Sequence, residues 1–340
     1  MTIHVGLIGG GNISQAHARA ANAIPGVEVA AVYGTNADKV TRLTRESGGT
    51  PYSDFEAFLK HRPLDMVVIG SPSGMHARHG IAAARNGLHV LTEKPIDIST
   101  ENADKLIAVA RESGVKLGVI FQDRFKPDIR KFKQWIDDGV IGKPLFVDAR
   151  VKWYRPPEYY SGSKWRGTRA LDGGGALINQ AVHTVDLLLW LFGAVIHVQS
   201  HIATKLHAIE SEDIAIALLD FSSGAVGTLV ASTAVFPGYP RRIEAIGTEG
   251  TLVLEHDRII AADLRNAASE ITPGTPSKDN ENTGSPVVSD FSGHQAVFED
   301  FIQAIQNNSE PACHGLEGRK SIALVEEIYR AARNNTASVR

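Results

Sequence analysis

The stretch IHVGLIGGGNIS, residues 3–14, combines a short apolar run, a glycine loop and the start of a helical pattern. Within it Gly9, Gly11 and Ser14 give the spacing G-x-G-x-x-S. The first glycine permits a tight turn, and the second lets a pyrophosphate approach the backbone. The helix that follows offers unpaired N–H groups and a partial positive charge. A second apolar run at Val27–Tyr33 completes the order strand, loop, helix, strand, which predicts a dinucleotide-binding unit.

Apolar runs continue to alternate with helical patterns as far as residue 122. Strands buried on both faces and separated by helices predict a doubly wound parallel sheet, a Rossmann-type α/β domain over residues 1–122. Ser53 and Glu56 have the spacing of a capping box. The further predicted strands are Asp65–Gly70, Leu88–Leu91 and Val115–Phe121, and the helices are His76–Asn86, closed by Gly87, and Thr100–Ser113, closed by Gly114.

After residue 122 the pattern changes, and we expect a second α/β domain over residues 123–340 with an open, mostly antiparallel sheet. Strand runs separated by turn residues suggest a meander through Ile214–Phe221, Ala225–Thr233, Arg242–Gly247 and Thr251–Glu255. The other expected elements are a helix at Lys126–Asp138, a strand at Pro144–Trp153, a loop at 154–175, a long helix at Ala176–Phe192, a polar surface loop or partly disordered segment at 266–290, and closing helices at His294–Asn307 and Gly318–Ala332.

The amino-acid composition excludes several classes of partner and site. The 340 residues carry 35 Lys and Arg against 38 Asp and Glu, a net charge of −3, which argues against nucleic acid or an anionic membrane as partner. The single cysteine, Cys313, excludes an intramolecular disulfide and a Cys-rich zinc site, and the scattered histidines indicate no metal site. No apolar run is long enough to span a bilayer, and we expect a cytoplasmic protein.

The end of the second strand, where a Rossmann fold recognises the cofactor ribose, reads Tyr33-Gly34-Thr35-Asn36. A carboxylate there would select a 2′-hydroxyl, and an arginine would select a 2′-phosphate. This chain has neither, and Thr35 and Asn36 can hydrogen-bond either form. The choice between NAD and NADP therefore stays open.

Three further motifs carry a resemblance. They are Thr92-Glu93-Lys94-Pro95, Phe121-Gln122-Asp123-Arg124-Phe125-Lys126-Pro127, and the run from Asp172-Gly173-Gly174-Gly175 to His183-Thr184-Val185-Asp186. With the glycine loop and Ser71-Pro72…His76, the chain resembles the Gfo/Idh/MocA family of NAD(P)-dependent oxidoreductases along essentially its whole length.

The resemblance implies that Lys94 and His183 are catalytic. An ammonium at Lys94 stabilises a developing alkoxide, and an imidazole of near-neutral pKa takes the hydroxyl proton. Asn179, His183 and Asp186 have the spacing of one helix face. The family often has Asp where this chain has Asn179, so Asn179 is expected to bind substrate, and Asp186 to orient or pack. The family often has a cis peptide before Pro95.

The expected cofactor contacts follow from the glycine loop, the strand ends and the motifs. They are Gly9, Gly11, Asn12, Ile13, Gly34, Thr35, Asn36, Ser71, Pro72, His76, Glu93, Lys94 and Gln122.

Residues 150–169 hold six basic side chains, one acid and five Trp or Tyr. Aromatic faces stack on sugars, and arginine binds phosphate or carboxylate, so an anionic or nucleotide sugar is one interpretation; a solvated basic loop or a subunit contact is the other. Arg124 is assigned to the pocket edge or, alternatively, to a surface ion pair. The expected substrate contacts are Lys94, Arg124, Tyr154, Arg155, Trp165, Arg166, Asn179 and His183.

The main hypothesis is a dehydrogenase that transfers hydride from a secondary alcohol of a sugar, cyclitol or sugar derivative to nicotinamide. Two alternatives remain: a redox-neutral NAD-dependent glycosidase and an NAD(P)-sensing regulatory protein. The resemblance also implies a homodimer or homotetramer formed through the open sheet of the second domain.

Overall fold

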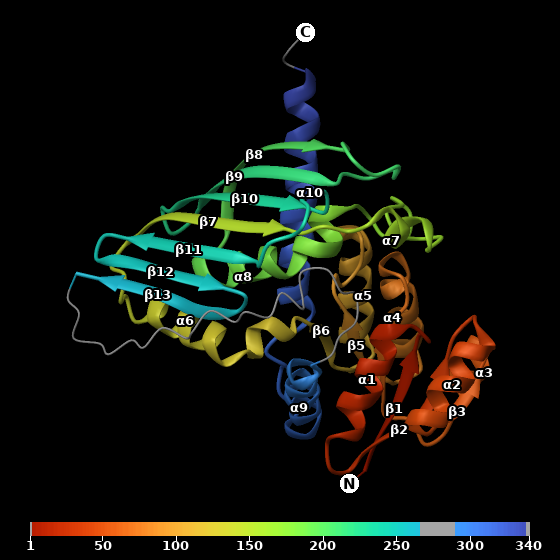
Figure 1. The fold of residues 1–340 in the computed structure, drawn as a ribbon. Coiled ribbons are helices and arrows are strands. Elements are labelled where there is room, and N and C mark those ends of the chain that lie inside the picture. Colours follow the sequence, from red (N-terminus) through yellow and green to blue (C-terminus); the bar gives the residue numbers. More distant parts are fainter. Residues whose placement is uncertain (1, 266–289, 338–340) are drawn as a thin grey trace. The chain divides into compact units, whose positions relative to one another are not determined.

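A computed structural model describes residues 2–265 and 290–337 (Figure 1). The chain divides into two compact units. The first is Met1–Gln122 with Pro286–Ile322, and the second is Asp123–Ser285 with Ala323–Arg340. The expected second domain of 123–340 thus includes a segment that clusters with the first unit.

The first unit contains a six-stranded parallel sheet in the order β3-β2-β1-β4-β5-β6. This confirms the predicted parallel Rossmann sheet, in which successive strands are added on one side as far as β3 and on the other side from β4 onward. Its strands are β1 (Ile3–Ile8), β2 (Val27–Tyr33), β3 (Thr50–Tyr52), β4 (Met66–Ile69), β5 (His89–Glu93) and β6 (Leu117–Ile120); its helices are α1 (Asn12–Asn22), α2 (Ala37–Ser47), α3 (Phe55–Leu59), α4 (His76–Arg85) and α5 (Thr100–Glu112), with a 3₁₀ turn η1 (Ser73–Met75).

The structure of this unit differs from the sequence predictions at two places. The capping box at Ser53 is wrong, because the Asp54 side chain accepts from Ala57 N at 2.7 Å and caps α3. The short edge strand β3 was not expected, since Thr50-Pro51-Tyr52 has no apolar alternation. The predicted helix-terminating glycines Gly87 and Gly114 are confirmed, with φ of +76° and +67°.

Helix α9 (Ser292–Asn307) explains why the C-terminal segment joins the first unit. Its residues Val297, Phe298 and Phe301 are buried, and a Cβ at Gly118 of β6 would lie 2.7 Å from the Phe301 ring. In the segment that follows, the Cys313 carbonyl accepts a hydrogen bond from Val119 N at 2.8 Å. Helix α10 (Gly315–Ala337) begins directly after it.

The second unit contains a seven-stranded sheet in the order β13-β12-β11-β7-β10-β9-β8 (Figure 1). All neighbouring strands are antiparallel except β7 and β10. The strands are β7 (Pro144–Lys152), β8 (Val195–Ala203), β9 (Ile214–Phe221), β10 (Val226–Ser232), β11 (Arg242–Gly247), β12 (Gly250–Glu255) and β13 (Arg258–Leu264); the helices are α6 (Pro127–Asp137), α7 (Pro157–Ser161), the π-helical segment η3 (Ala176–Ala181) and α8 (Val182–Phe192).

The open, mostly antiparallel sheet is confirmed, but the simple meander is wrong. Strand β7 lies between β10 and β11, because the connection from Thr233 to Arg241 is long enough to cross it. Strands β8 and β13 were not predicted. The loop expected at 154–175 contains α7, and the long helix expected at Ala176–Phe192 is η3 followed by α8. The polar segment at 266–289 lies outside the described residues.

The two faces of this sheet differ. Val147, Ala149, Leu229 and Ala217 alternate inward and are buried. On the other face, four apolar side chains are exposed by 37–51%, and we call them the open-face patch: Phe146, Ile216, Leu218 and Val226. No helix within the described ranges is both long enough and apolar enough to cross a membrane.

The buried histidines of the first unit predict a pH-dependent stability. Burial, together with His76 and Arg78, lowers the pKa of His79 to about 4, and burial also lowers the pKa of His17 and His89. Unfolded histidine titrates near 6.5, so the stabilisation by neutral His79 is complete above pH 6.5 and is lost as the pH falls toward 4.

We expect the melting temperature to fall across this window, and His79→Asn to reduce the slope by about 1 kcal/mol per pH unit. Thermal unfolding at several pH values measures it. His197→Asn, which removes an exposed histidine of the second unit, is the control and should leave the slope unchanged. An unaltered slope in His79→Asn contradicts the assignment.

Candidate active site

The glycine loop after β1 has the geometry of a phosphate cradle. Gly9 has φ of +133°, and a Cβ there would lie 2.7 Å from the Gly70 carbonyl oxygen, so the turn requires glycine. A Cβ at Gly11 would meet no atom within 4 Å, which leaves the backbone open to a ligand. Asn12 and Ile13 begin α1, and Gly11 provides no side-chain cap. The first helical N–H groups are therefore suited to a dinucleotide phosphate.

Two polar atoms near this edge of the sheet support the fit. Ser14 Oγ and Gln122 Oε1 are buried and have no hydrogen-bond partner among the described residues. Gln122 follows β6, and Ser71-Pro72 follow β4, so both lie at the carboxyl ends of strands, where Rossmann folds bind ligands. Ser71 Oγ lies 3.0 Å from His79 Nδ1.

The end of β2 explains why an acid is missing there. A Cβ at Gly34 would lie 2.8 Å from Val40 Cγ2, so a side chain there would require Val40 to move. Asn36 caps α2, because its side chain accepts from Lys39 N at 3.0 Å. Thr35 is exposed beside it.

The loop after β5 carries Lys94, which is half-buried, and the expected cis peptide between Lys94 and Pro95 is present. His76 supports this loop from α4. Its Nδ1 lies 2.7 Å from the Pro95 carbonyl and its Nε2 2.9 Å from the Ser71 carbonyl. The buried carboxylate of Asp97 accepts from Ala77 N at 3.0 Å and from Ile98 N at 2.8 Å. The turn around Lys94 is thus fixed by side chains of neighbouring segments.

In the second unit, the glycine run before η3 is a packing requirement. A Cβ at Gly175 would lie 1.8 Å from the Glu212 carbonyl oxygen, and one at Gly174 would lie 2.1 Å from Tyr329 Oη. The Glu212 carboxylate accepts from Leu177 N at 2.8 Å and from Tyr329 Oη at 3.1 Å. Burial raises the pKa of Glu212, and burial with the nearby carboxylate raises that of Tyr329 well above its usual range.

Asn179 lies on η3, so it is not part of the same regular helix as His183. Its Nδ2 donates to Asp172 Oδ1 at 2.6 Å, and its Oδ1 accepts from Gln180 Nε2 at 3.3 Å. A π-helical turn is rare and is often found at functional sites. The structure therefore holds the Asn179 carboxamide in a fixed orientation.

His183 lies in the first turn of α8 with 13% of its side chain exposed. Its Nδ1 is 3.8 Å from Asp123 Oδ2. Arg241 Nη1 donates to the same oxygen at 2.6 Å, and Lys126 Nζ lies 3.0 Å from Oδ1. Burial alone would raise the pKa of Asp123, but Arg241, His183 and Lys126 hold it well below its usual range. An ionised carboxylate thus faces the His183 ring.

The network continues through Asp257, which pairs with Arg241 and accepts from Lys126 Nζ at 2.6 Å. Two carboxylates and two cations balance one another, as buried charges require.

Arg124, expected at a pocket edge, is only 6% exposed and donates to both oxygens of Asp186 at 2.7 and 2.6 Å. Its guanidinium also lies 5.4 Å from the Trp190 ring. The Arg124–Asp186 pair is buried, unlike the surface ion pair considered above. Because Arg124 follows Asp123 in the chain, the pair ties Asp186 to the segment that carries Asp123.

The basic and aromatic segment connects to η3. Arg155 Nη2 donates to Gln180 Oε1 at 2.9 Å, and the Arg155 guanidinium lies 5.4 Å from the Tyr159 ring. Arg166 stacks 4.1 Å from the same ring. Trp165 lies 5.6 Å from Arg166, and the Tyr154 ring meets Phe236 edge-on at 5.3 Å. The segment therefore contacts Gln180, which in turn donates to Asn179.

Three residues of the second unit were not among the candidates from sequence: Asp123, Glu212 and Arg241. Asp123 was quoted within a motif but given no role. Glu212 and Arg241 had no local signal, because each acts on residues more than 30 positions away.

The fold and the glycine loop define an α/β oxidoreductase with an NAD-binding Rossmann domain, and comparison with known proteins agrees. A model described as "Oxidoreductase family, NAD-binding Rossmann fold" matches residues 3–121, and one described as "GFO/IDH/MocA C-terminal domain" matches residues 129–253. The chain belongs to the Gfo/Idh/MocA oxidoreductase family.

Three relatives illustrate its range. The WlbA dehydrogenase from Bordetella pertussis, solved with NADH and UDP-GlcNAcA, is 31% identical, with a TM-score of 0.88 over 98% of this chain and 96% of that one. Myo-inositol 2-dehydrogenase from Thermotoga maritima is 25% identical over 95% of this chain and 94% of its own. The 1,5-anhydro-D-fructose reductase from Ensifer adhaerens is 27% identical over 98% and 97%. The chain is accordingly an oxidoreductase of a family that acts on sugar and polyol alcohols.

We expect Asp123→Asn to destabilise the protein by about 3 kcal/mol, because it leaves the buried Arg241 and the half-buried Lys126 with one carboxylate fewer. This contribution is complete above about pH 4 and is lost as the pH falls below it. Urea unfolding at pH 7 measures it. The control Asp148→Asn breaks the half-exposed pair with Arg150 and should cost less than about 1 kcal/mol. Equal losses in the two variants would contradict the network.

Proposed function

We propose that this protein is an NAD-dependent dehydrogenase that oxidises a secondary alcohol of a sugar, cyclitol or sugar derivative. The observation that carries the proposal is the His183 ring, held beside the ionised Asp123 carboxylate. An imidazole oriented by a carboxylate is the arrangement of a general base. The NAD-binding domain in the same chain supplies the complementary redox partner.

Each side chain then has a role. The glycine loop and the start of α1 would hold NAD, which would supply the hydride acceptor for the carbinol carbon. His183 accepts the hydroxyl proton at Nε2, because Nδ1 faces Asp123 and the nearby carboxylate stabilises the imidazolium that forms. The Lys94 ammonium stabilises the negative charge developing on the oxygen. Asn179, fixed by Asp172, binds a neighbouring hydroxyl.

For the substrate class, we propose an anionic sugar, with a nucleotide sugar acid as the leading candidate. Arg155 and Arg166 stack on Tyr159, and Arg155 also reaches η3 through Gln180. Arginine planes and aromatic faces suit a phosphate or carboxylate beside a sugar ring. The relative WlbA, solved with UDP-GlcNAcA, supports this choice. Tyr154, Trp165 and Arg124 remain predicted substrate-site residues.

We expect His183→Ala to lower kcat by about 10²–10⁴-fold while leaving NADH affinity within a few-fold of the wild type. Turnover with UDP-GlcNAcA and with myo-inositol is followed by the absorbance of NADH, and NADH binding by its fluorescence. The control His201→Ala removes an exposed histidine and should change neither. Undiminished turnover removes His183 from its role, and product formation without net NADH would instead indicate the redox-neutral glycosidase.

We further propose that two copies of the chain associate through the open-face patch. Four neighbouring apolar side chains on one sheet face are unusual for a surface that stays in water. The flat, self-complementary face of a sheet suits a two-fold interface.

Light scattering is expected to give at least twice the 36.6 kDa chain mass. Leu218→Asp, at the centre of the patch, should give the monomer mass with an unchanged far-UV CD spectrum. The control Leu316→Asp changes an exposed leucine of the first unit and should leave the mass unchanged. A monomeric wild type would refute the interface.

A further inference from the structure

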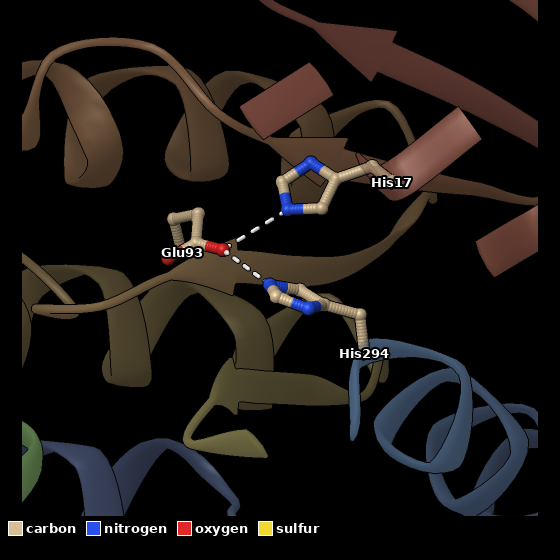
Figure 2. A group of neighbouring side chains, drawn as sticks. All are labelled: His17, Glu93 and His294. Carbon is tan, nitrogen blue, oxygen red and sulfur yellow. Dashed lines mark hydrogen bonds and ion pairs between the residues drawn. The ribbon is translucent and has the colours of Figure 1, made fainter. Parts of the chain in front are cut away.

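Within the first unit, one buried cluster has no part in the chemistry proposed above. His17 of α1, Glu93 at the end of β5 and His294 of α9 come together in the interior (Figure 2). Their exposed fractions are 0%, 6% and 2%. Imidazole Nε2 atoms approach Glu93 Oε1 from two sides, at 3.0 Å for His17 and 3.6 Å for His294.

The second oxygen of Glu93 has a different partner. Oε2 accepts from the backbone N–H of Lys94 at 3.1 Å. The carboxylate therefore lies between two histidines on one side and the lysine backbone on the other. The next residue, Pro95, has no backbone N–H. The Lys94 amide is therefore the donor through which the Glu93 carboxylate can fix this turn.

An ionised carboxylate is a stronger acceptor than a neutral carboxyl, and both of its oxygens can accept. Burial alone would raise the pKa of Glu93, but the two histidines hold it well below its usual range. The phenyl ring of Phe298, 6.1 Å from that of His17, helps to close the cluster.

We propose that His17, Glu93 and His294 form a positioning cluster that fixes the backbone of Lys94, so that Glu93 is a positioning residue for the reaction. The inference rests on the proposed function, because it assumes that Lys94 acts on the substrate. The proposal also assigns a role to α9, because this helix from the C-terminal part of the chain supplies the imidazole of His294.

The same three side chains present the ligand types of a divalent metal site, with their nearest donor atoms all within 4.8 Å of one another. The hydrogen-bond pattern favours the positioning cluster. A histidine that binds a metal through Nε2 carries its proton on Nδ1 and usually donates it to an acceptor. His17 Nδ1 is buried and has no acceptor among the described residues. For His17, a bare Nδ1 with Nε2–H donating to Glu93 leaves no N–H unpaired.

The test compares Glu93→Ala with Glu93→Gln, whose amide oxygen still accepts from Lys94 N–H. Hydrogen exchange of the Lys94 amide, resolved by mass spectrometry with electron-transfer fragmentation, measures the contact directly and needs no substrate. We expect exchange at least 100-fold faster in Glu93→Ala and within ten-fold of the wild type in Glu93→Gln.

Kinetics with the best substrate of the panel above adds the functional readout. Glu93→Ala should lower kcat about 100-fold, with KM and NADH affinity changed less than three-fold, and Glu93→Gln should recover most of the loss. The control Asp65→Ala breaks another His–carboxylate pair, His4 with Asp65 at 3.0 Å, at the opposite end of β1 and β4. It should change neither exchange at Lys94 nor kcat.

If Glu93→Ala does not fold, His294→Gln tests the cluster with a smaller expected loss of about ten-fold in kcat. Unchanged exchange at Lys94, or faster exchange with unchanged kcat, overturns the proposal. One equivalent of metal in the purified wild type, absent from Glu93→Ala, also overturns it. Full turnover in Lys94→Met would instead refute the proposed function, and the exchange result would still stand for the contact itself.

Discussion

The site in the second unit depends on one steric constraint, the contact between the glycine run and the Glu212 backbone. The Glu212 carbonyl occupies the space that a side chain at Gly175 would need, and its carboxylate receives the first N–H groups of η3. This contact takes the place of a helix cap and sets where the π-helical segment begins. Asn179 lies on that segment, and His183 is in the turn that follows. The glycines therefore serve the chemistry through packing, without touching a ligand.

Each unit also buries an ionised carboxylate, and the two are stabilised differently. Asp123 is surrounded by permanent cations, Arg241 and Lys126, so its charge is balanced at any ordinary pH. Glu93 lies between two imidazoles: His17 Nε2 is within hydrogen-bond distance at 3.0 Å, and His294 Nε2 is 3.6 Å away. The first arrangement suits a carboxylate that faces a histidine proposed as the general base. The second suits one that only has to hold a backbone amide.

What the sequence predicted well is local. The glycine loop, the alternation of strands and helices as far as residue 122, and the glycine stops depend on neighbouring residues and are confirmed. The insertion of β7 between β10 and β11 depends on where a long connection leads, which no local pattern records. The pairs Arg124–Asp186 and Glu93–His294 join residues far apart in the chain. Sequence alone identified Arg124, Asp186 and Glu93 without their partners, and named His294 only as the start of a helix. The roles of Lys94 and His183 came from the family resemblance.

The neutral residue at position 179 follows from the same packing. The family often has an aspartate there, but in this chain Asn179 lies 2.6 Å from an oxygen of the buried Asp172. A carboxylate at 179 would place two negative charges at hydrogen-bond distance, and one of them would have to take up a proton. The amide donates to Asp172 instead, while Asp172 accepts from Gly167 N through its other oxygen at 2.8 Å. In this chain the contact with Asp172 therefore favours asparagine at position 179, and our proposal assigns proton transfer to His183.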